Sequence, residues 1–186
     1  MALVAALLTG AVAAAVEVPV PALLGPMSFS LPLVLLLPLV PVCLVIHGQG
    51  RGDTASEVVA VRSLARWDTT TMLLLAVSAI SLGVVESQFY DFPLGIAMGR
   101  NFVGYLGLAL LIRGLAGPAV ATSLVCVVPF FCTSFGVAGW GRPRFWAWPL
   151  HESGSVIAFV AALILLAAGL AVAARSGPGP RRTALA

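Results

Sequence analysis

Apolar residues run along this chain in long segments that are separated by short polar or charged stretches. A helix that crosses a bilayer needs about 20 such residues, and the usable range begins near 17. The first two segments reach that length only if they extend into their flanks. We therefore predict an all-α, polytopic integral membrane protein in which residues 1–175 form one transmembrane domain. The six predicted spans cover about residues 2–20, 28–47, 69–87, 93–113, 118–138 and 155–174.

Both ends of the chain need a separate interpretation. Residues 1–16 end in small side chains and resemble a signal peptide, but no basic residue precedes Arg51. A secretory signal normally begins with positive charge, so we interpret this segment as the first span and keep cleavage as the alternative. Residues 176–186, SGPGPRRTALA, are rich in Gly, Pro and Arg. They predict a disordered basic tail.

The composition agrees with a membrane protein and removes several classes of function. Of the 186 residues, 60% are hydrophobic and 9% are charged, where soluble domains carry about 25% charged residues. The chain contains no lysine, so the phosphate-binding loop G-x-x-x-x-G-K-[ST] of an ATPase is impossible. Ten basic residues against seven acidic ones are too small an excess for a nucleic-acid binder. The three cysteines lie in apolar segments and are odd in number, which is typical of small buried side chains and not of a disulfide scaffold.

The arginines predict the orientation of the spans. Cytoplasmic loops are enriched in basic residues, and placing the N-terminus inside gives seven inner arginines against three outer ones. The inner set is Arg51, Arg62, Arg66, Arg113, Arg175, Arg181 and Arg182, and the outer set is Arg100, Arg142 and Arg144. We therefore expect both termini inside. Arginine without lysine, among abundant Ala, Gly, Val and Leu, is typical of a GC-rich bacterial genome, so the expected location is the bacterial inner (plasma) membrane.

The loop of residues 48–68 carries a signal for the start of a helix. Thr54-Ala-Ser-Glu57 is a capping box, in which each of the two side chains accepts a hydrogen bond from a backbone N–H. We predict an amphipathic helix over residues 54–66. It either receives force from a cytoplasmic ATPase or lies on the bilayer surface, and the sequence does not separate the two. The residues assigned to this possible coupling helix are Thr54, Glu57, Val58, Val61, Arg62, Leu64 and Arg66.

One arginine falls inside a predicted span. A fourth span of normal length places Arg100 about a third of the way into the bilayer, beside Asn101. Arginine at the bilayer centre costs about 2.5–3.5 kcal/mol on insertion scales, so it is normally paired or hydrated. Glu86 and Asp91 are the candidate partners. In the alternative that we prefer, Arg100 extends outward to the interface and the span begins near Phe102.

Two further features concern packing and the outer surface. Gly95 and Gly99 form a G-x-x-x-G motif, which is typical of close helix packing within one chain or between chains; we expect the former. The outer loop of residues 138–154 either forms a lid or re-entrant hairpin that shapes an exit path, or is an aromatic belt at the membrane surface. The belt explains the tryptophans but not the Arg-Pro-Arg sequence. The candidate residues of this loop are Arg142, Arg144, Trp146, Trp148, His151 and Glu152.

Catalytic and metal sites have little support in the sequence. Ser-Gly-Ser follows His151-Glu152, so the zinc motif H-E-x-x-H is absent, as is the nucleophile motif G-x-S-x-G. Cys43 and His47 lie four residues apart, as metal ligands can, but no second Cys/His pair accompanies them. We expect no enzymatic activity, no cofactor and no metal.

Four short stretches carry a resemblance to a known family. They are VPVPALLG (18–25), VRSLARWD (61–68), GRNFVGYLGLALL (99–111) and FWAWPL (145–150). Together with six spans, a helix after the second span and an aromatic loop before the last, they resemble the membrane subunit of ABC-2-type exporters and actinobacterial permease-like proteins. The chain is short for that family and lacks its N-terminal interfacial helix. A reduced or accessory subunit therefore fits as well as a full one.

The resemblance implies a function and partners. It implies a permease-like subunit of an ATP-driven exporter, coupled through residues 48–68 to a separate ATP-binding subunit, with a path lined partly by the fourth and fifth spans. The subunit would form a homo- or heterodimer, so the expected partners are the ATP-binding subunit, a second permease copy, or both. The alternative is a non-transporting membrane scaffold, immunity or regulatory protein. The scarcity of intramembrane charge favours this alternative and counts against a proton- or sodium-driven carrier. The other expected partner is the lipid bilayer, and no nucleic acid is expected.

Overall fold

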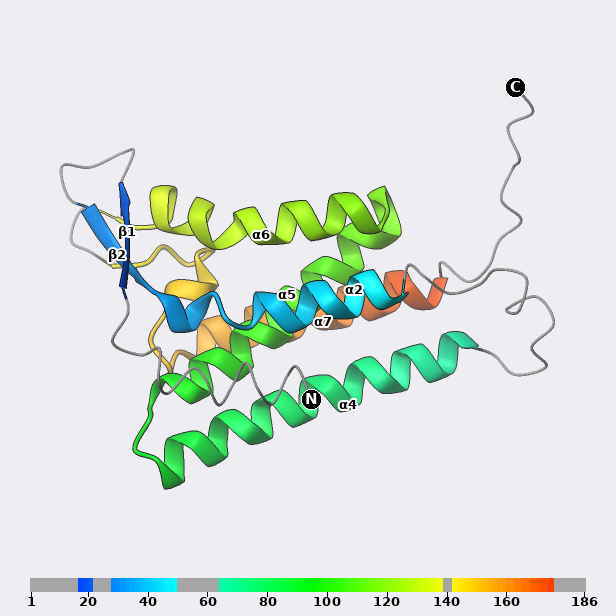
Figure 1. The fold of residues 1–186 in the computed structure, drawn as a ribbon, viewed down its shortest axis with the longest axis horizontal. Helices are drawn as coiled ribbons and strands as arrows, with labels where there is room; N and C mark the ends of the chain where they lie inside the picture. Colours follow the sequence, from blue (N-terminus) through cyan, green and yellow to red (C-terminus); the bar gives the residue numbers. More distant parts are fainter. Residues whose placement is uncertain (1–16, 22–27, 50–63, 139–141, 176–186) are drawn as a thin grey trace.

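The computed structural model describes residues 17–21, 28–49, 64–138 and 142–175, and helices form most of this part of the chain (Figure 1). Four of the helices are long and apolar enough to cross a membrane. They overlap the last four predicted spans to within a few residues. These helices are α4 (Leu64–Phe89), α5 (Leu94–Ala116), α6 (Pro118–Phe135) and α7 (Val156–Arg175).

The second predicted span is a shorter helical segment that a proline interrupts. A 3-10 turn, η1 (Leu33–Leu35), precedes the helix α2 (Leu39–Gln49). Pro38 has no backbone N–H with which to continue a helix, and α2 begins at the next residue. The Val40 N–H bonds instead to the carbonyl of Leu37 at 3.2 Å, three residues back. The α-helix therefore starts only after Pro38.

Two stretches predicted as helical are β-strands. β1 (Glu17–Pro21) and β2 (Ser28–Pro32) pair antiparallel, with Glu17 opposite Pro32. The predicted spans 2–20 and 28–47 were wrong at these residues. The reason lies in the Val-Pro-Val-Pro sequence: proline disfavours the helical conformation in the residue before it and removes a donor from the helix. Residues 1–16 of the first predicted span lie outside the described part of the chain.

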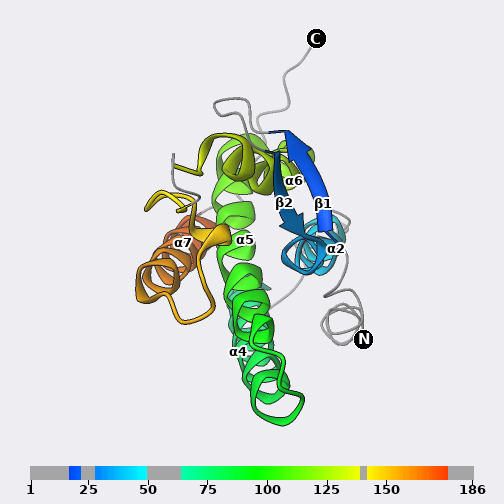
Figure 2. The ribbon, with the colours of Figure 1, turned by 90° about the vertical axis from the view of Figure 1, so that its left-hand side faces the viewer.

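α5 is the central helix of the bundle. Seen from one end, it lies between α2 and α7, with α6 on one side and α4 on the other (Figure 2). Its most apolar stretch is 78% buried inside the protein, whereas the corresponding stretch of α7 is 22% buried. The core of the molecule therefore forms around α5, and the other long helices keep broad apolar faces exposed.

Glycines allow the neighbours of α5 to approach its backbone. A Cβ atom added at Gly107 would overlap the backbone of Leu166 in α7, and one added at Gly99 would lie 2.6 Å from the carbonyl oxygen of Ala79 in α4. Gly95 likewise faces the backbone of Gly83 in α4. The G-x-x-x-G motif of Gly95 and Gly99 thus packs within the chain, which confirms that prediction.

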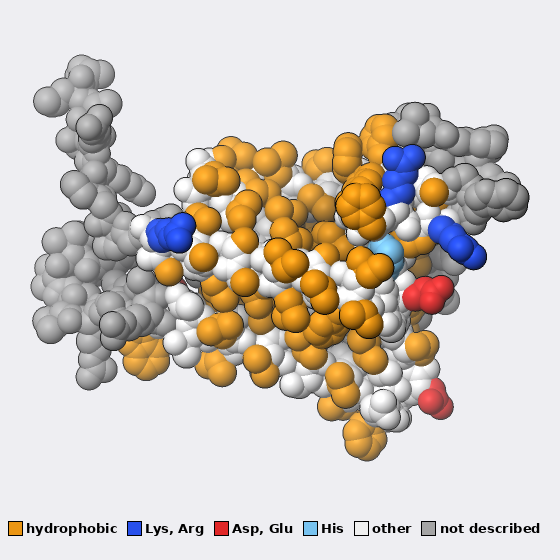
Figure 3. All heavy atoms as spheres, turned by 180° about the vertical axis from the view of Figure 1, so that it is seen from behind, with side chains coloured by type: hydrophobic (Ala, Val, Ile, Leu, Met, Phe, Trp, Pro, Cys, Tyr) orange, Lys and Arg blue, Asp and Glu red, His pale blue; other side chains and the backbone are white. Residues whose placement is uncertain are grey.

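One face of the molecule carries an apolar belt between two charged ends (Figure 3). In Figure 3 hydrophobic side chains cover the middle of the molecule, and the charged side chains lie towards its two ends. Such a belt suits the hydrocarbon of a bilayer, because charged groups are costly there and favourable at the headgroups. Together with the four helices that are long and apolar enough to cross a membrane, this belt suggests a helical membrane protein.

One boundary of the predicted amphipathic helix needs correction. Residues 54–63, which include Thr54, Glu57, Val58, Val61 and Arg62, lie outside the described part of the chain. Leu64 and Arg66, however, belong to the first turn of α4. The residues from 64 to 71 contain no Gly or Pro, and Leu, Ala and Arg favour helix strongly. The third helix therefore begins five residues earlier than the predicted residue 69.

Candidate functional site

Arg100 and Asn101 form a buried polar site in the second turn of α5. Arg100 is 1% exposed and Asn101 is fully buried. The helix already begins at Leu94, so the alternative that we preferred, an outward-extending Arg100 and a span from Phe102, was wrong. The physical reason is that the guanidinium finds hydrogen-bond acceptors inside the protein and does not need to reach the interface.

The acceptors are backbone carbonyls of the segment that leads into α7. Arg100 Nη1 donates to the carbonyl oxygen of Glu152 at 2.8 Å, and Nη2 donates to that of His151 at 2.8 Å. Asn101 Nδ2 donates to the carbonyl oxygen of Pro149 at 3.1 Å, and its Oδ1 accepts from Arg100 Nε at 3.4 Å. The planar guanidinium fork thus holds two successive peptide groups, a geometry that arginine supports well.

The predicted carboxylate partners lie elsewhere. Glu86 is buried near the end of α4, where its Oε2 has no hydrogen-bond partner among the described residues. Asp91 is exposed in the turn before α5 and has a positive φ of 49°. Among the described residues, Arg100 donates its hydrogen bonds to uncharged groups. These are the backbone carbonyls of His151 and Glu152 and the side-chain oxygen of Asn101.

Trp148 anchors the same segment against α5. It begins the 3-10 turn η2 (Trp148–Leu150) and is 6% exposed. Its ring lies 5.0 Å from that of Tyr105 at an interplanar angle of 58°, a favourable tilted arrangement. A Cβ atom at Gly104 would collide with the indole, so only glycine leaves room there. The aromatic-belt interpretation was therefore wrong for Trp148, which is a core residue.

The other residues predicted for the outer loop play different parts. Trp146 packs on Phe131 of α6, with ring centroids 5.8 Å apart. The side chains of Arg142, Arg144 and Glu152 are exposed, and Glu152 takes part in the site through its carbonyl alone.

The backbone around the two arginines forms a small hairpin. Val137 and Pro143 form an antiparallel bridge, and Arg144 N donates to the carbonyl of Gly136 at 2.7 Å. His151 closes the loop: its Nε2 lies 3.1 Å from the carbonyl oxygen of Arg144 and its Nδ1 lies 3.3 Å from Ser155 Oγ. The described residues of the loop are therefore hydrogen-bonded both to one another and to α5.

The residues of the site share one face of α5. Asn101 and Tyr105 are separated by four positions, as are Arg100 and Gly104, so each pair lies one helical turn apart. This spacing is the signal from which Gly104 and Tyr105 could have been found. No sequence signal marked the carbonyl acceptors, because every residue has a backbone carbonyl.

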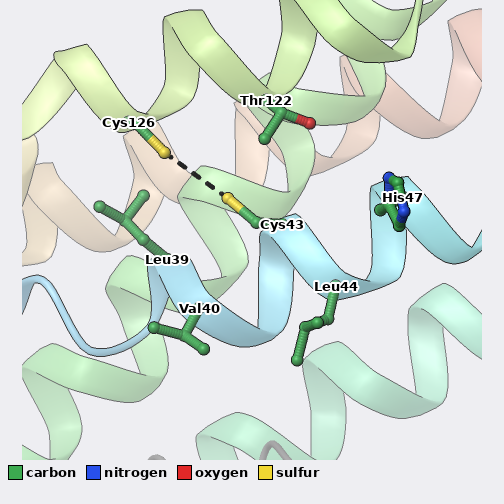
Figure 4. A pocket seen from close by; sticks show the side chains of 7 residues that line it. All are labelled: Leu39, Val40, Cys43, Leu44, His47, Thr122 and Cys126. Carbon is green, nitrogen blue, oxygen red and sulfur yellow. Dashed lines mark hydrogen bonds between the residues drawn. The ribbon is translucent and has the colours of Figure 1, made fainter.

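A second feature lies between α2 and α6, where the sequence indicated buried cysteines and a Cys43–His47 pair with too few partners for a metal site. An apolar groove with a volume of about 430 Å³ lies between the two helices, and Figure 4 shows Cys43 and Cys126 pointing towards each other across it. Their Sγ atoms are 3.6 Å apart. His47 lines the same groove, but no cluster of three or more metal-ligating side chains was found among the described residues.

Comparisons with known proteins leave the chain without an assigned relative. No protein-family model matches it, and neither a curated protein nor a solved structure matches it at a significant level.

Proposed function

We propose that the chain is a permease-like membrane subunit of an ATP-driven exporter, in which residues 148–152 form an outer closure. The observation that carries the proposal is the set of hydrogen bonds from Arg100 and Asn101 to three carbonyls of that segment. A buried cation is costly and is normally kept where it serves a function. Here the cation, Arg100, holds the segment that leads into α7 and not another long helix.

The chemistry of this contact suits a segment that opens. Carbonyl dipoles bind a guanidinium without carrying charge, so release of the segment leaves no unpaired carboxylate behind in the membrane. The exposed Arg100 would then need water, and a hydrated opening at this end of the bundle would supply it. Residues 148–152 therefore act as a closure. When they move away, water reaches the outer half of α5.

The resemblance to exporter membrane subunits supports the same assignment. Two of the stretches that carry it, residues 99–111 and 145–150, meet in the fold through Tyr105 and Trp148. The topology that goes with the proposal has the four long helices crossing a bacterial plasma membrane, with residues 64 and 175 on the inner side and the β1–β2 ribbon and residues 148–152 outside. It assigns no catalytic step to this chain, because ATP hydrolysis belongs to the partner subunit.

The experiment is co-purification of the tagged full-length chain in mild detergent, followed by mass spectrometry. We expect a stoichiometric ATPase that carries the G-x-x-x-x-G-K-[ST] loop. Replacing both Val58 and Val61 with Asp removes the apolar face of the predicted coupling helix and should abolish this association. Phe145→Asp places one such charge on an exposed residue (77% exposed) outside the predicted coupling helix and should leave the association unchanged.

A membrane scaffold or regulatory protein is the second candidate. The observation that favours it is backbone packing on two sides of α5, at Gly99 against Ala79 and at Gly107 against Leu166, because such contacts make a bundle rigid. Recovery of the chain alone, or only with copies of itself, would contradict the exporter proposal and support the scaffold.

A further inference from the structure

The pair of cysteines between α2 and α6 brings together two thiols that are 83 positions apart in sequence. Cys43 and Cys126 are both half-buried, and their Sγ atoms are 3.6 Å apart. In Figure 4 each side chain points from its own helix towards the other across the groove. Two thiols that meet in this way form a site for two-electron chemistry.

The surroundings of the pair provide access from the lipid phase. The groove beside the two sulfurs has a volume of about 430 Å³ and is lined largely by apolar side chains, within the size range of small-molecule sites. Val40 and Leu44 at the groove are both more than half exposed, at 55% and 54%. A small apolar reagent dissolved in the bilayer can therefore reach the thiols.

We propose that Cys43 and Cys126 are a dithiol modification site, which a lipid-soluble quinone converts into a disulfide between α2 and α6. The two S–H bonds break and one S–S bond forms. The two electrons and two protons released reduce the quinone to its quinol. The site thus needs no oxidant other than the one named, and it stands independently of the exporter function.

The geometry requires only a small movement. A disulfide has a sulfur–sulfur distance of about 2.05 Å, so the two atoms must approach by roughly 1.5 Å from their separation of 3.6 Å. α2 is suited to move, because it is short, it follows the break at Pro38, and a groove separates part of it from α6. The bond would then fix α2 against α6.

The third cysteine provides a control on the same helix. Cys132 lies in α6 and is 3% exposed, and its packing in the core keeps it away from reagents in the lipid. Oxidation through the Cys43–Cys126 site therefore removes two of the chain's three thiols and leaves Cys132 reduced.

The test uses the full-length chain in liposomes, with and without a short-chain quinone. After incubation the protein is denatured and labelled with a polyethylene-glycol maleimide, which adds mass at each free thiol. We expect three labels without quinone, for the three cysteines, and one label with it. The Cys132→Ala variant should change from two labels to none. The oxidised product should be a monomer on a non-reducing gel.

A matched variant keeps the number of thiols and moves one of them. Cys126→Ala combined with Val127→Cys places the thiol at a position that is 55% exposed and displaced by about 100° around α6. It should retain all its labels in the presence of quinone. Full labelling of the unaltered chain, equal loss of labels in this variant, or a disulfide-linked dimer would overturn the proposal.

Discussion

The contact between α5 and α7 and the contact between α2 and α6 are built in opposite ways. Gly107 and Gly169 face each other's helices so closely that a Cβ atom at either would overlap backbone atoms of the other helix. Between α2 and α6, larger side chains such as Leu39 and Leu44 line an open groove of about 430 Å³. In the α5–α7 contact the two backbones touch, whereas the α2–α6 contact leaves an open groove.

The difference teaches what holds helices together in an apolar environment. Lipid tails are as apolar as leucine, so burial of leucine gives helices little reason to associate within a bilayer. Close van der Waals contact between helices does favour their association, and small residues make such contact possible. α5 therefore stays central because its glycines admit α4 and α7, while the side of α2 that faces α6 leaves an open groove.

The largest expected effect comes from breaking the close contact. Gly107→Leu places a side chain where the backbone of Leu166 lies, and overpacking against backbone costs about 3 kcal/mol or more. We expect loss of most of the monodisperse folded protein, measured by size-exclusion chromatography and thermal unfolding in detergent. Gly154→Ala, where nothing lies within 4 Å of the added Cβ, should leave both measurements unchanged. A stable Gly107→Leu variant would contradict the close contact.

The second prediction tests the polar contact at the outer end of α5. Arg100→Leu removes the donors to His151 and Glu152, and hydrogen bonds to charged groups contribute about 1.5–3 kcal/mol each. We expect the segment to open, so that a thiol reagent labels a cysteine introduced at Ser153 at least tenfold faster, in a chain whose natural cysteines are replaced. Arg144→Leu, at an exposed arginine in the same loop, should not change the rate. Arg100→Lys should fall between, because it keeps the charge but not the fork.

A smaller effect is expected where α4 approaches α5. Gly99→Ala would put a methyl group 2.6 Å from the carbonyl oxygen of Ala79, and α4 must shift by a few tenths of an ångström. We expect a loss of about 1–2 kcal/mol, measured as a lower midpoint of unfolding. Gly48→Ala, which meets nothing within 4 Å, is the control. An unchanged midpoint for Gly99→Ala would show that the α4–α5 contact is looser than the α5–α7 contact.

The smallest effect is expected at the groove. Cys126→Ala removes a half-buried sulfur from a contact that already leaves space, and should cost less than about 1 kcal/mol. Cys132→Ala deletes the same atom on the same helix from a site that is 3% exposed, and should cost more. The shift in unfolding midpoint of Cys126→Ala, divided by that of Cys132→Ala, compares how tightly α6 packs around each of these two positions. Equal shifts would contradict the comparison.

The errors of the sequence interpretation have identifiable causes. The N-terminal prediction weighed the apolar composition of residues 17–20 and 28–32 and neglected the alternating Pro19 and Pro21, which favour extended backbone. The prediction for Arg100 recognised the cost of its burial but looked for acidic side chains as partners. Its actual acceptors are carbonyls 51 and 52 positions away, and backbone carbonyls are the same in every residue.

Composition and apolar length alone predicted helices long enough to cross a membrane and the approximate bounds of α4, α5, α6 and α7, and they singled out Arg100 as costly to bury. These properties depend on local hydrophobicity, which each segment carries in its own residues. Only the tertiary structure made α5 the central helix, joined Arg100 to residues 151 and 152, and placed Cys43 beside Cys126. These relations join residues far apart in the chain, and their geometry depends on how closely the helices pack, which glycines permit at some contacts and larger side chains prevent at others.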